Sequence, residues 1–318
     1  MINWLVIGIG DITRKRVIPA IQSEPNSALY AVLTRDPAKA AAYKDTIAYT
    51  TLDTALADPN IHAVYVASPV YLHAPHSIAA LKAGKHVLCE KPLALTYAEA
   101  QTMQVAAQQS GKLLAAAYYR RLYPKLIRAK ELIAQGAIGQ PILAEATCHG
   151  WLESEERAWL RDPAIAGGGP LFDIASHRID ACNFLFGAPI AATGILSNTV
   201  HQLKVEDSAT SLIQYANGIH ATVDVRWNSR IPRDEFRILG TTGELLLTPL
   251  GAPTLFIKTS NSTVVAEENL PTHENVHYPI IEDFTSAILN NHAPAAPIAE
   301  AIHTDLVTDW VMQSTRRA

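Results

Sequence analysis

The chain has 318 residues, of which 48% are hydrophobic and 18% charged, and its formal net charge is −4. This length allows two domains of ordinary size, and the charge, without a clustered basic stripe, argues against nucleic-acid binding. No apolar run approaches the roughly 18 residues of a membrane span, and the apolar start lacks the basic region of a signal peptide. Three widely spaced cysteines, Cys89, Cys148 and Cys182, predict reduced thiols in a cytoplasmic protein.

The first 120 residues alternate between short apolar runs and helical patterns. Almost continuously apolar runs, typical of buried parallel strands, occupy residues 4–9, 28–33, 63–66, 86–89 and 113–117. The intervening patterns predict helices over residues 14–22, 37–43, 52–57, 74–83 and 97–109. Thr96 and Glu99 have the spacing of a capping box, and Gly84 and Gly111 stand where helices should end. This alternation predicts a parallel sheet covered by helices on both faces.

The pattern changes in the second half of the chain. Helices are expected over residues 124–135, from the glycines at 167–169 to near Gly187, and over 280–289 and 298–314. Alternating runs at 208–215 and 219–227 flank Asn217-Gly218, a strong hairpin signal, and further strands are expected at 236–239 and 244–247. These patterns predict a mixed or antiparallel sheet with helices on one face.

A glycine turn follows the first predicted strand and has the sequence GIGDIT, residues 8–13. In a dinucleotide-binding turn, the first glycine permits the bend and the second lets the backbone approach the pyrophosphate, while the helix N-terminus supplies amide donors. Thr13 stands where the fingerprint has its third glycine. The position between strand and helix predicts dinucleotide binding through Gly8, Gly10, Asp11 and Ile12, with a purely structural turn as the alternative.

The end of the second predicted strand bears on cofactor choice. An NAD enzyme usually places a carboxylate there to bind the ribose 2′-hydroxyl. This chain has Thr34, which offers a hydroxyl, and Arg35, whose guanidinium suits a 2′-phosphate. Asp36 precedes Pro37 and a helical run, so it is better interpreted as an N-cap. NADP is therefore favoured over NAD, with an ordinary surface arginine as the alternative for Arg35.

The strand at 86–89 ends in a charged pair followed by proline, Glu90-Lys91-Pro92. Charges at the carboxyl end of a parallel strand stand where such sheets bind ligands. From this feature alone, a ligand-binding role and a solvated ion pair are equally open.

Several motifs together resemble the Gfo/Idh/MocA oxidoreductase family. The tripeptide Glu90-Lys91-Pro92 is similar to that family's signature. Similar segments are SPVYLH (68–73), AGKHVL (83–88), RLYP (121–124), GAIG (136–139) and GGGPLFDIASH (167–177), and the resemblance continues through Glu206-Asp207 to the terminal helices. Departures are Thr13 and the pair Tyr118-Tyr119 ahead of Arg120.

The resemblance implies an α/β fold: a Rossmann domain over residues 1–120, and a substrate-binding α+β domain over 121–318 with a large, mostly antiparallel open sheet. The terminal helices are free to pack back on the first domain. It implies hydride transfer between NAD(P) and a hydroxyl or carbonyl carbon of a sugar, cyclitol or related polyol, and homodimers or larger homo-oligomers formed through the open sheet. It also places six further residues at the cofactor: Ser68, Pro69, His73, Glu90, Lys91 and Arg121.

The predicted helix after the glycine run has three polar residues at helical spacing, Asp173, His177 and Asp180. A helix would place them on one face, where His177 suits acid–base chemistry near neutral pH. Two ligands, Asp173 and His177, are too few for a metal site, so no metal is expected. Further candidates for substrate binding are Tyr119, Trp159 and Arg161, with packing or surface charge as the alternative.

The hypothesis for the mechanism assigns three roles. In oxidation, His177 takes the hydroxyl proton while hydride leaves the carbon for the nicotinamide, and the Lys91 ammonium stabilises the developing negative charge. Asp173 binds a neighbouring substrate hydroxyl or orients His177. Whether Lys91 or His177 transfers the proton stays open at this point.

Two alternatives to a sugar dehydrogenase remain. One is a non-catalytic, dinucleotide-binding regulator; regulators of this family generally lack the catalytic lysine and histidine, which this chain retains as Lys91 and His177. The other is an enzyme of the same fold that acts on a non-sugar substrate, such as an aromatic dihydrodiol or an imine.

Overall fold

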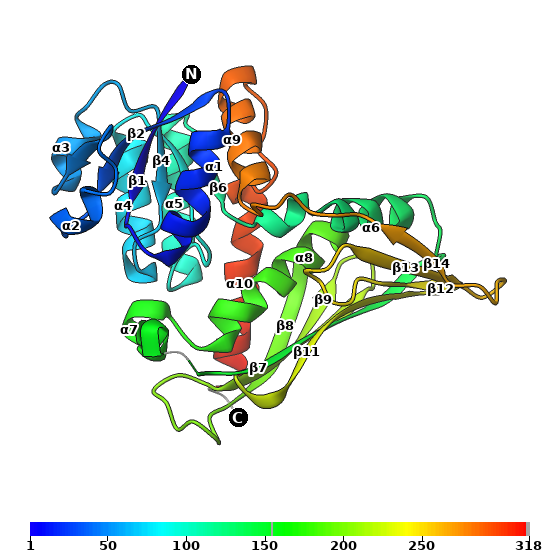
Figure 1. The fold of residues 1–318 in the computed structure, drawn as a ribbon. Helices are drawn as coiled ribbons and strands as arrows, with labels where there is room; N and C mark the ends of the chain where they lie inside the picture. Colours follow the sequence, from blue (N-terminus) through cyan, green and yellow to red (C-terminus); the bar gives the residue numbers. More distant parts are fainter. Residues whose placement is uncertain (154, 316–318) are drawn as a thin grey trace. The chain divides into compact units, whose positions relative to one another are not determined.

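The structure is a computed structural model that describes residues 1–153 and 155–315. The chain divides into two compact units, of which unit 1 comprises residues 1–119 and 273–302, and unit 2 comprises residues 120–272 and 303–318 (Figure 1). The first boundary between the units follows residue 119, one residue before the domain boundary expected after residue 120. Residues 273–302, which were expected in the second domain with freedom to pack back, belong to unit 1.

Unit 1 is built on a six-stranded parallel sheet with the order β3-β2-β1-β4-β5-β6. The strands are β1 (Ile2–Ile7), β2 (Ser27–Leu33), β3 (Ile47–Tyr49), β4 (Ala63–Val66), β5 (His86–Cys89) and β6 (Leu114–Ala116). The five apolar runs expected as strands form β1, β2, β4, β5 and β6, which confirms them. Every residue of β4 and of β6 is buried. The edge strand β3 was missed because it has only three residues, none of them buried.

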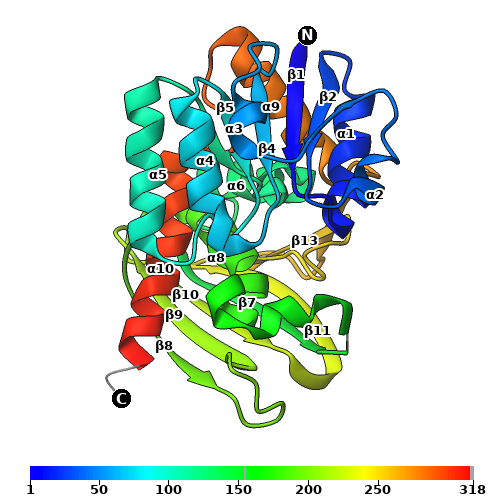
Figure 2. The same cartoon turned by 90° about the vertical axis from the view of Figure 1, so that its left-hand side faces the viewer.

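The helices of unit 1 follow the strands in chain order. They are η1 (Thr13–Val17), α1 (Ile18–Ser23), α2 (Pro37–Ala40), α3 (Leu52–Leu56), η2 (Val70–Leu72), α4 (His73–Lys82), α5 (Tyr97–Ser110) and α9 (Tyr278–Asn290). Helices α4 and α5 lie side by side (Figure 2). The regular helix expected over 14–22 is instead a π-helical turn followed by α1, because Pro19 cannot donate a helical hydrogen bond.

The predicted helix ends of unit 1 are confirmed. Asp36 caps α2 by accepting a hydrogen bond from the Ala38 amide at 3.0 Å, and Thr96 caps α5 by accepting from the Glu99 amide at 3.2 Å. Gly111 ends α5 with a φ of +65°, a left-handed conformation in which glycine avoids the strain of a side chain.

Unit 2 contains an eight-stranded mixed sheet with the order β14-β13-β12-β11-β7-β10-β9-β8. The strands are β7 (Pro141–Trp151), β8 (Pro189–Ser197), β9 (Ser208–Tyr215), β10 (His220–Arg226), β11 (Asn228–Gly240), β12 (Gly243–Leu246), β13 (Thr254–Thr259) and β14 (Ala266–Asn269). The hairpin predicted around Asn217-Gly218 is confirmed as β9 and β10. Among the described strand pairs of the unit 2 sheet, β7 with β10 is parallel and the others are antiparallel. Four strands, β7, β8, β13 and β14, were not predicted.

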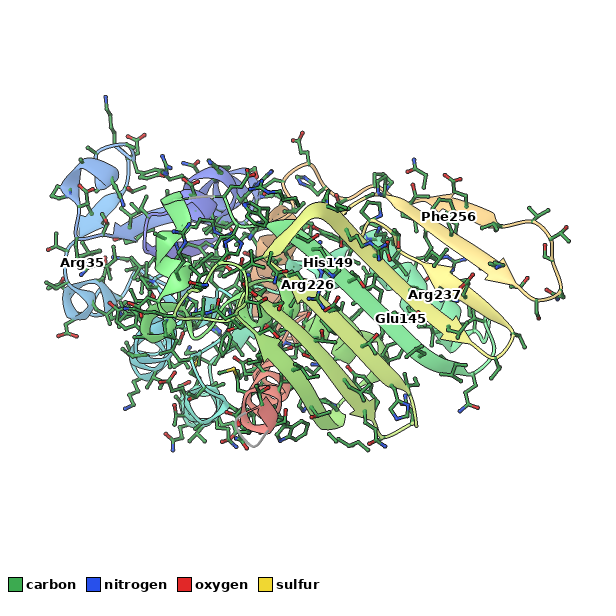
Figure 3. The ribbon with its side chains drawn as sticks, turned by 90° about the horizontal axis from the view of Figure 1, so that it is seen from below. Arg35, Glu145, His149, Arg226, Arg237 and Phe256 are labelled. Atoms are coloured by element: carbon green, nitrogen blue, oxygen red, sulfur yellow. The ribbon has the colours of Figure 1, made fainter. Side chains whose placement is uncertain are left out.

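One face of the unit 2 sheet packs on helices, as the alternating burial shows. Ala221, Val223 and Val225 of β10 are fully buried, whereas Thr222 and Asp224 point to the other, open face. The helical elements of this unit are η3 (Tyr119–Leu122, whose first residue is in unit 1), α6 (Pro124–Ala134), η4 (Glu155–Arg161), α7 (Pro163–Ala166), η5 (Leu171–Ala175), α8 (Ser176–Phe186) and most of α10 (Ile298–Thr315). Figure 3 shows the open face, from which Glu145, His149 and Arg226 project.

Over residues 1–153 and 155–315, no helix is both long and apolar enough to cross a bilayer.

Candidate active site

The glycine turn of unit 1 packs closely against a neighbouring loop at Gly8 and is open at Gly10. Gly8 has a φ of +91°, and a Cβ built on it would lie 2.6 Å from the carbonyl oxygen of Ala67, so only glycine fits there. A Cβ built on Gly10 would meet no atom within 4 Å, which leaves open space beside the backbone. Thr13, in place of the third glycine, accepts from the Gly10 amide at 2.9 Å and donates to its carbonyl at 3.0 Å. The threonine therefore braces the turn instead of disrupting it.

The segment after β2 combines a cap with an exposed cation. The Asp36 carboxylate caps α2 by accepting a hydrogen bond from the Ala38 backbone amide. The Thr34 hydroxyl accepts a hydrogen bond from the Asp36 backbone amide at 3.2 Å. Arg35 is exposed at the surface of unit 1 (Figure 3). Asp11 and Ile12 are exposed in the glycine turn, where Asp11 pairs with Arg14 and, at 2.9 Å, with Lys15.

His73 joins two loops at the carboxyl edge of the unit 1 sheet. Its Nδ1 lies 2.8 Å from the carbonyl oxygen of Pro92, and its Nε2 lies 2.8 Å from that of Ser68. Burial lowers the pKa of His73, while both carbonyls act to raise it. The ring is only 2% exposed and its nitrogens face backbone, so His73 holds the loops of Ser68 and Pro92 together. Pro69, beside Ser68, is exposed.

Glu90 follows β5 and is buried. Its Oε1 accepts from the Tyr65 hydroxyl at 2.7 Å, and its Oε2 accepts from the Lys91 amide at 3.2 Å. His277 places Nε2 3.6 Å from Oε1, an ion-pair distance longer than a hydrogen bond. Burial raises the pKa of Glu90, but His277, the Tyr65 hydroxyl and the Lys91 charge outweigh it and leave that pKa below its usual value. The Lys91 side chain, in contrast, is partly exposed.

In unit 2, a continuous helical backbone from Leu171 to Phe186 carries two predicted catalytic residues, Asp173 in η5 and His177 in α8. The helix expected after the glycine run, with its end at Gly187, is therefore confirmed. The Asp173 carboxylate accepts from Arg157 at 3.0 Å and is 12% exposed. His177 is 7% exposed.

Glu206 anchors the start of this helical segment. Its Oε1 accepts from the amides of Gly169 and Leu171 at 2.9 and 3.0 Å. A Cβ on Gly169 would lie 2.0 Å from the Glu206 carbonyl oxygen, so this close approach requires glycine. Burial raises the pKa of Glu206, although its backbone donors oppose the rise. The glycine run and Glu206 together position the backbone that leads to Asp173.

Arg121 and Asp180 form a buried ion pair in unit 2. The Arg121 Nε lies 3.0 and 3.1 Å from the two carboxylate oxygens, and its Nη2 lies 2.8 Å from Oδ1. Each side chain is 1% exposed. Asp180 was expected on one face with Asp173 and His177, but it is committed to this pair. Arg121 was expected at the cofactor, and that role stays a prediction.

Comparison with known proteins decides the family. Residues 2–118 match a family described as "Oxidoreductase family, NAD-binding Rossmann fold", and residues 126–246 match "GFO/IDH/MocA C-terminal domain". The trans-1,2-dihydrobenzene-1,2-diol dehydrogenase of Mus musculus is 30% identical over 263 residues, which cover 80% of this chain and 76% of that protein. The chain belongs to the Gfo/Idh/MocA oxidoreductase family. The family resemblance and the fold class inferred from the sequence are thus confirmed.

Other relatives of this family member are similar over nearly the whole chain. The 1,5-anhydro-D-fructose reductase of Ensifer adhaerens is 29% identical over 309 residues, covering 93% of this chain and 91% of that protein. The solved structure of a levoglucosan dehydrogenase in complex with NADH has a TM-score of 0.91 at 24% identity, covering 99% of this chain and 97% of that one. The likeness to the levoglucosan dehydrogenase structure shows that the two chains share a fold.

The remaining predicted residues of this family member lie on short helical turns. Tyr119 begins η3, and its ring centroid lies 4.5 Å from that of His277. Trp159 is 41% exposed and Arg161 partly buried at the end of η4. Their roles toward substrate stay predictions. Within the described parts of the chain, no group of three or more histidine, cysteine or acidic side chains is placed to hold a metal ion.

Sequence reasoning missed three residues that shape these sites. Glu206 was noted only as part of a motif shared with the family, which was the available signal. Tyr65 lies in a strand that was read as plain core. His277 is 187 residues from Glu90 in the chain, and no local pattern connects the two.

Proposed function

We propose that this protein is an NAD(P)-dependent dehydrogenase or reductase that transfers hydride between nicotinamide and a hydroxyl or carbonyl carbon of a sugar, cyclitol or related polyol. The observation that carries the proposal is the turn of unit 1, where Gly8 admits no side chain and Gly10 has open space beside its backbone. Such a turn fits the pyrophosphate of a dinucleotide. The names of the Ensifer reductase and the levoglucosan dehydrogenase support a sugar-like substrate.

The residues that would hold the cofactor are the glycine turn, Arg35, and the loops of Ser68 and Glu90. When bound, the nicotinamide supplies the hydride acceptor or donor. In oxidation, His177 accepts the hydroxyl proton, and Lys91 as ammonium stabilises the oxygen as negative charge develops. Asp173 orients a neighbouring hydroxyl or His177. In reduction, the same groups act in reverse.

The test of this function is nicotinamide absorbance with the purified chain. The panel contains levoglucosan, 1,5-anhydro-D-fructose, D-xylose, myo-inositol and a trans-dihydrodiol, each with NADP and NAD in both directions. Turnover that Lys91→Ala abolishes and His177→Ala lowers by roughly 10²- to 10⁴-fold supports the proposal. Silence across the panel with dinucleotide binding intact favours the regulator, and absence of dinucleotide binding refutes both.

A dihydrodiol is the second candidate substrate. The observation that favours it is the 30% identity to the Mus musculus dihydrodiol dehydrogenase. Faster turnover of the dihydrodiol than of every sugar in the panel would select it.

Between NADP and NAD, we propose NADP as the cofactor. The Asp36 carboxylate accepts a backbone bond at the start of α2, and the guanidinium beside it, Arg35, is exposed. A charge-assisted bond from Arg35 to the 2′-phosphate predicts that Arg35→Ala weakens NADPH binding by about tenfold to a hundredfold. NADH binding should stay unchanged. Lys82→Ala, at the end of α4, is the control; equal losses for both nucleotides would contradict this assignment.

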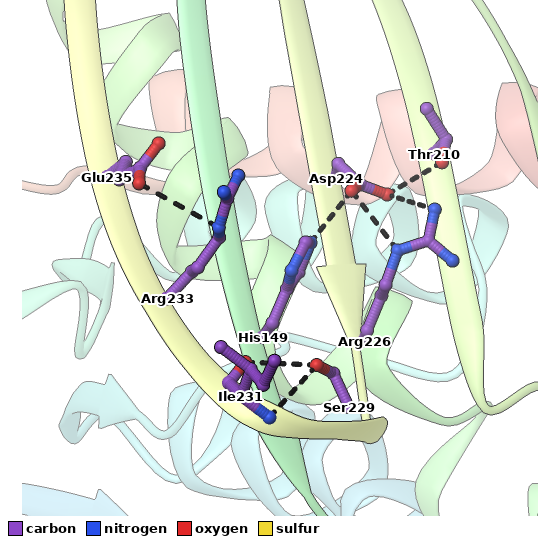
Figure 4. Close-up of polar contacts among 8 residues, drawn as sticks. All are labelled: His149, Thr210, Asp224, Arg226, Ser229, Ile231, Arg233 and Glu235. Carbon is purple, nitrogen blue, oxygen red and sulfur yellow. Dashed lines mark hydrogen bonds and ion pairs between the residues drawn. The ribbon is translucent and has the colours of Figure 1, made fainter.

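Homo-oligomerisation through the open face of the unit 2 sheet is proposed as well. On this face His149 lies 2.7 Å from Asp224, which also accepts from Thr210 at 2.7 Å and from Arg226 (Figure 4). The exposed Leu212 adds apolar area. Light scattering of the purified chain tests the proposal: a dimer or larger species that Leu212→Arg converts to monomer supports it, and a monomeric wild type contradicts it.

A further inference from the structure

His73 is a buried histidine whose two ring nitrogens both face carbonyl oxygens. It begins α4 and is 2% exposed. Its Nδ1 lies 2.8 Å from the Pro92 carbonyl oxygen, and its Nε2 lies 2.8 Å from the Ser68 carbonyl oxygen. A neutral imidazole has one N–H and one bare nitrogen, so it can donate to only one of these oxygens. The two contacts together therefore require the imidazolium, which carries a proton on each nitrogen.

Other assignments of the ring do not fit the two distances. A bare nitrogen and a carbonyl oxygen are both acceptors, and they would repel each other at the length of a hydrogen bond. Turning the ring over would place carbons at these positions, but C–H···O contacts are normally about 3.3–3.6 Å long. His73 therefore bonds both carbonyl oxygens only while its ring is doubly protonated.

The two carbonyl groups belong to two loops of unit 1, the loop after β4 (residues 67–69) and the loop after β5 (residues 90–92). The loop after β4 packs on the glycine turn, because a Cβ built on Gly8 would lie 2.6 Å from the Ala67 carbonyl oxygen. Pro92, in the loop after β5, directly follows Lys91. His73 thus links the backbone beside the glycine turn to the backbone beside Lys91.

We propose that His73 is a positioning residue that acts as a proton-dependent clamp: its imidazolium joins the loops after β4 and β5, and its neutral form releases one of them. The inference rests on the proposed function, in which the glycine turn binds the cofactor and Lys91 lies at the reacting centre. His73 acts through the backbone of the two loops and need not touch the nicotinamide or the substrate. Because ordering of loops is part of the cost of binding, the protonated clamp should bind NADPH more tightly.

Neighbouring groups and burial act on the His73 proton in opposite directions. Glu90 in the loop after β5 favours the imidazolium, the Lys91 charge opposes it, and His76 is the titratable ring one turn along α4. Burial has the largest effect and lowers the pKa of His73 below its usual value of 6.5. The clamp is therefore complete in mildly acidic solution, and one of its two bonds is lost as the pH rises through this pKa.

The first measurement detects the protons of the ring and needs no ligand. The full chain is prepared with isotope-labelled histidine, and the ring nitrogens of His73 are followed by NMR over a pH series. Their signals are assigned from contacts with protons of Ser68 and Pro92. We expect both nitrogens to be protonated at low pH, and one to lose its proton with a midpoint below about pH 6.5. A ring that keeps one bare nitrogen at every pH at which the chain is folded overturns the inference.

The second measurement is NADPH affinity by calorimetry over the same pH series. We expect the wild-type affinity to weaken by about threefold to tenfold as the pH rises through the His73 midpoint, because one charge-assisted hydrogen bond between the loops is lost. His73→Gln should bind NADPH without this step. His76→Gln is the matched control on the same helix; the His76 Nδ1 lies 3.1 Å from the Ser68 hydroxyl, so the variant perturbs the same loop but should keep the step.

Each further outcome decides between the clamp and its alternatives. A pH step that survives in folded His73→Gln, or that disappears in His76→Gln alone, overturns the inference. If circular dichroism shows that His73→Gln does not fold, the two wild-type midpoints decide, since they must coincide within about half a pH unit. A wild-type chain that binds no NADPH at any pH would instead refute the proposed function, while the NMR titration still decides whether His73 carries two protons.

Discussion

Replacing Asp180 by alanine tests how strongly unit 2 depends on its buried ion pair. Arg121 and Asp180 are each 1% exposed and joined by contacts of 2.8, 3.0 and 3.1 Å. Asp180→Ala leaves a buried guanidinium without its carboxylate, so we expect the free energy of unfolding to fall by about 3–5 kcal/mol. For a unit of this size, that corresponds to a decrease in Tm on the order of 6–20 °C.

The assay is urea unfolding with hydrogen exchange read on unit 2 peptides, which separates this unit from unit 1. The double variant Arg121→Met with Asp180→Leu removes both charges and fills similar volume, so it should unfold within about 1–2 kcal/mol of wild type. A loss below about 1 kcal/mol in Asp180→Ala would refute the reasoning. A double variant as unstable as the single one would show that packing, and not the unpaired charge, sets the loss.

Three further predictions concern unit 1. Gly8→Ala places a methyl group 2.6 Å from the Ala67 carbonyl oxygen at a φ of +91°, so calorimetry should show NADPH binding abolished; retained affinity would contradict the tight turn. Burial lowers the pKa of His86 to about 4 from 6.5, and its Nδ1 accepts from the Leu113 amide at 3.2 Å. The stability of this neutral imidazole is therefore present above pH 6.5 and lost as pH falls toward 4, and His86→Asn should flatten that decline in urea midpoints; an unchanged slope would refute it. Asp36→Ala removes the cap of α2 and should lower the free energy of unfolding by about 1 kcal/mol in urea melts, whereas Lys39→Ala should not.

Much of the fold could be predicted because it is encoded locally. Continuous apolar runs such as residues 63–66 are long enough to define a buried strand, and Asn217-Gly218 defines a hairpin turn by backbone conformation alone. The same holds for Asp36, whose position before Pro37 indicated a cap that the structure contains. Strand β7 was missed because its buried face carries only small residues such as Ala144 and Ala146, and because its neighbours β10 and β11 lie far along the chain.

The candidate site divides in the same way. Glycines 8 and 10, the tripeptide at 90–92 and the run before Asp173 are contiguous motifs, so the sequence alone indicated the family and its cofactor class. Their physical requirements, a turn with left-handed backbone and charges at a strand end, concern neighbours in the chain. The family assignment, confirmed by the comparisons, therefore needed no tertiary information.

Pairings between distant residues were decided only by the tertiary structure. The sequence placed Asp180 beside His177 on a helical face, but folding commits it to Arg121, 59 residues away. Folding likewise brings His277 close to Glu90, and Glu206 close to Gly169. Local patterns determine backbone conformation because it depends on adjacent residues, whereas the partner of a buried charge depends on which side chains the packed chain brings within a few ångströms.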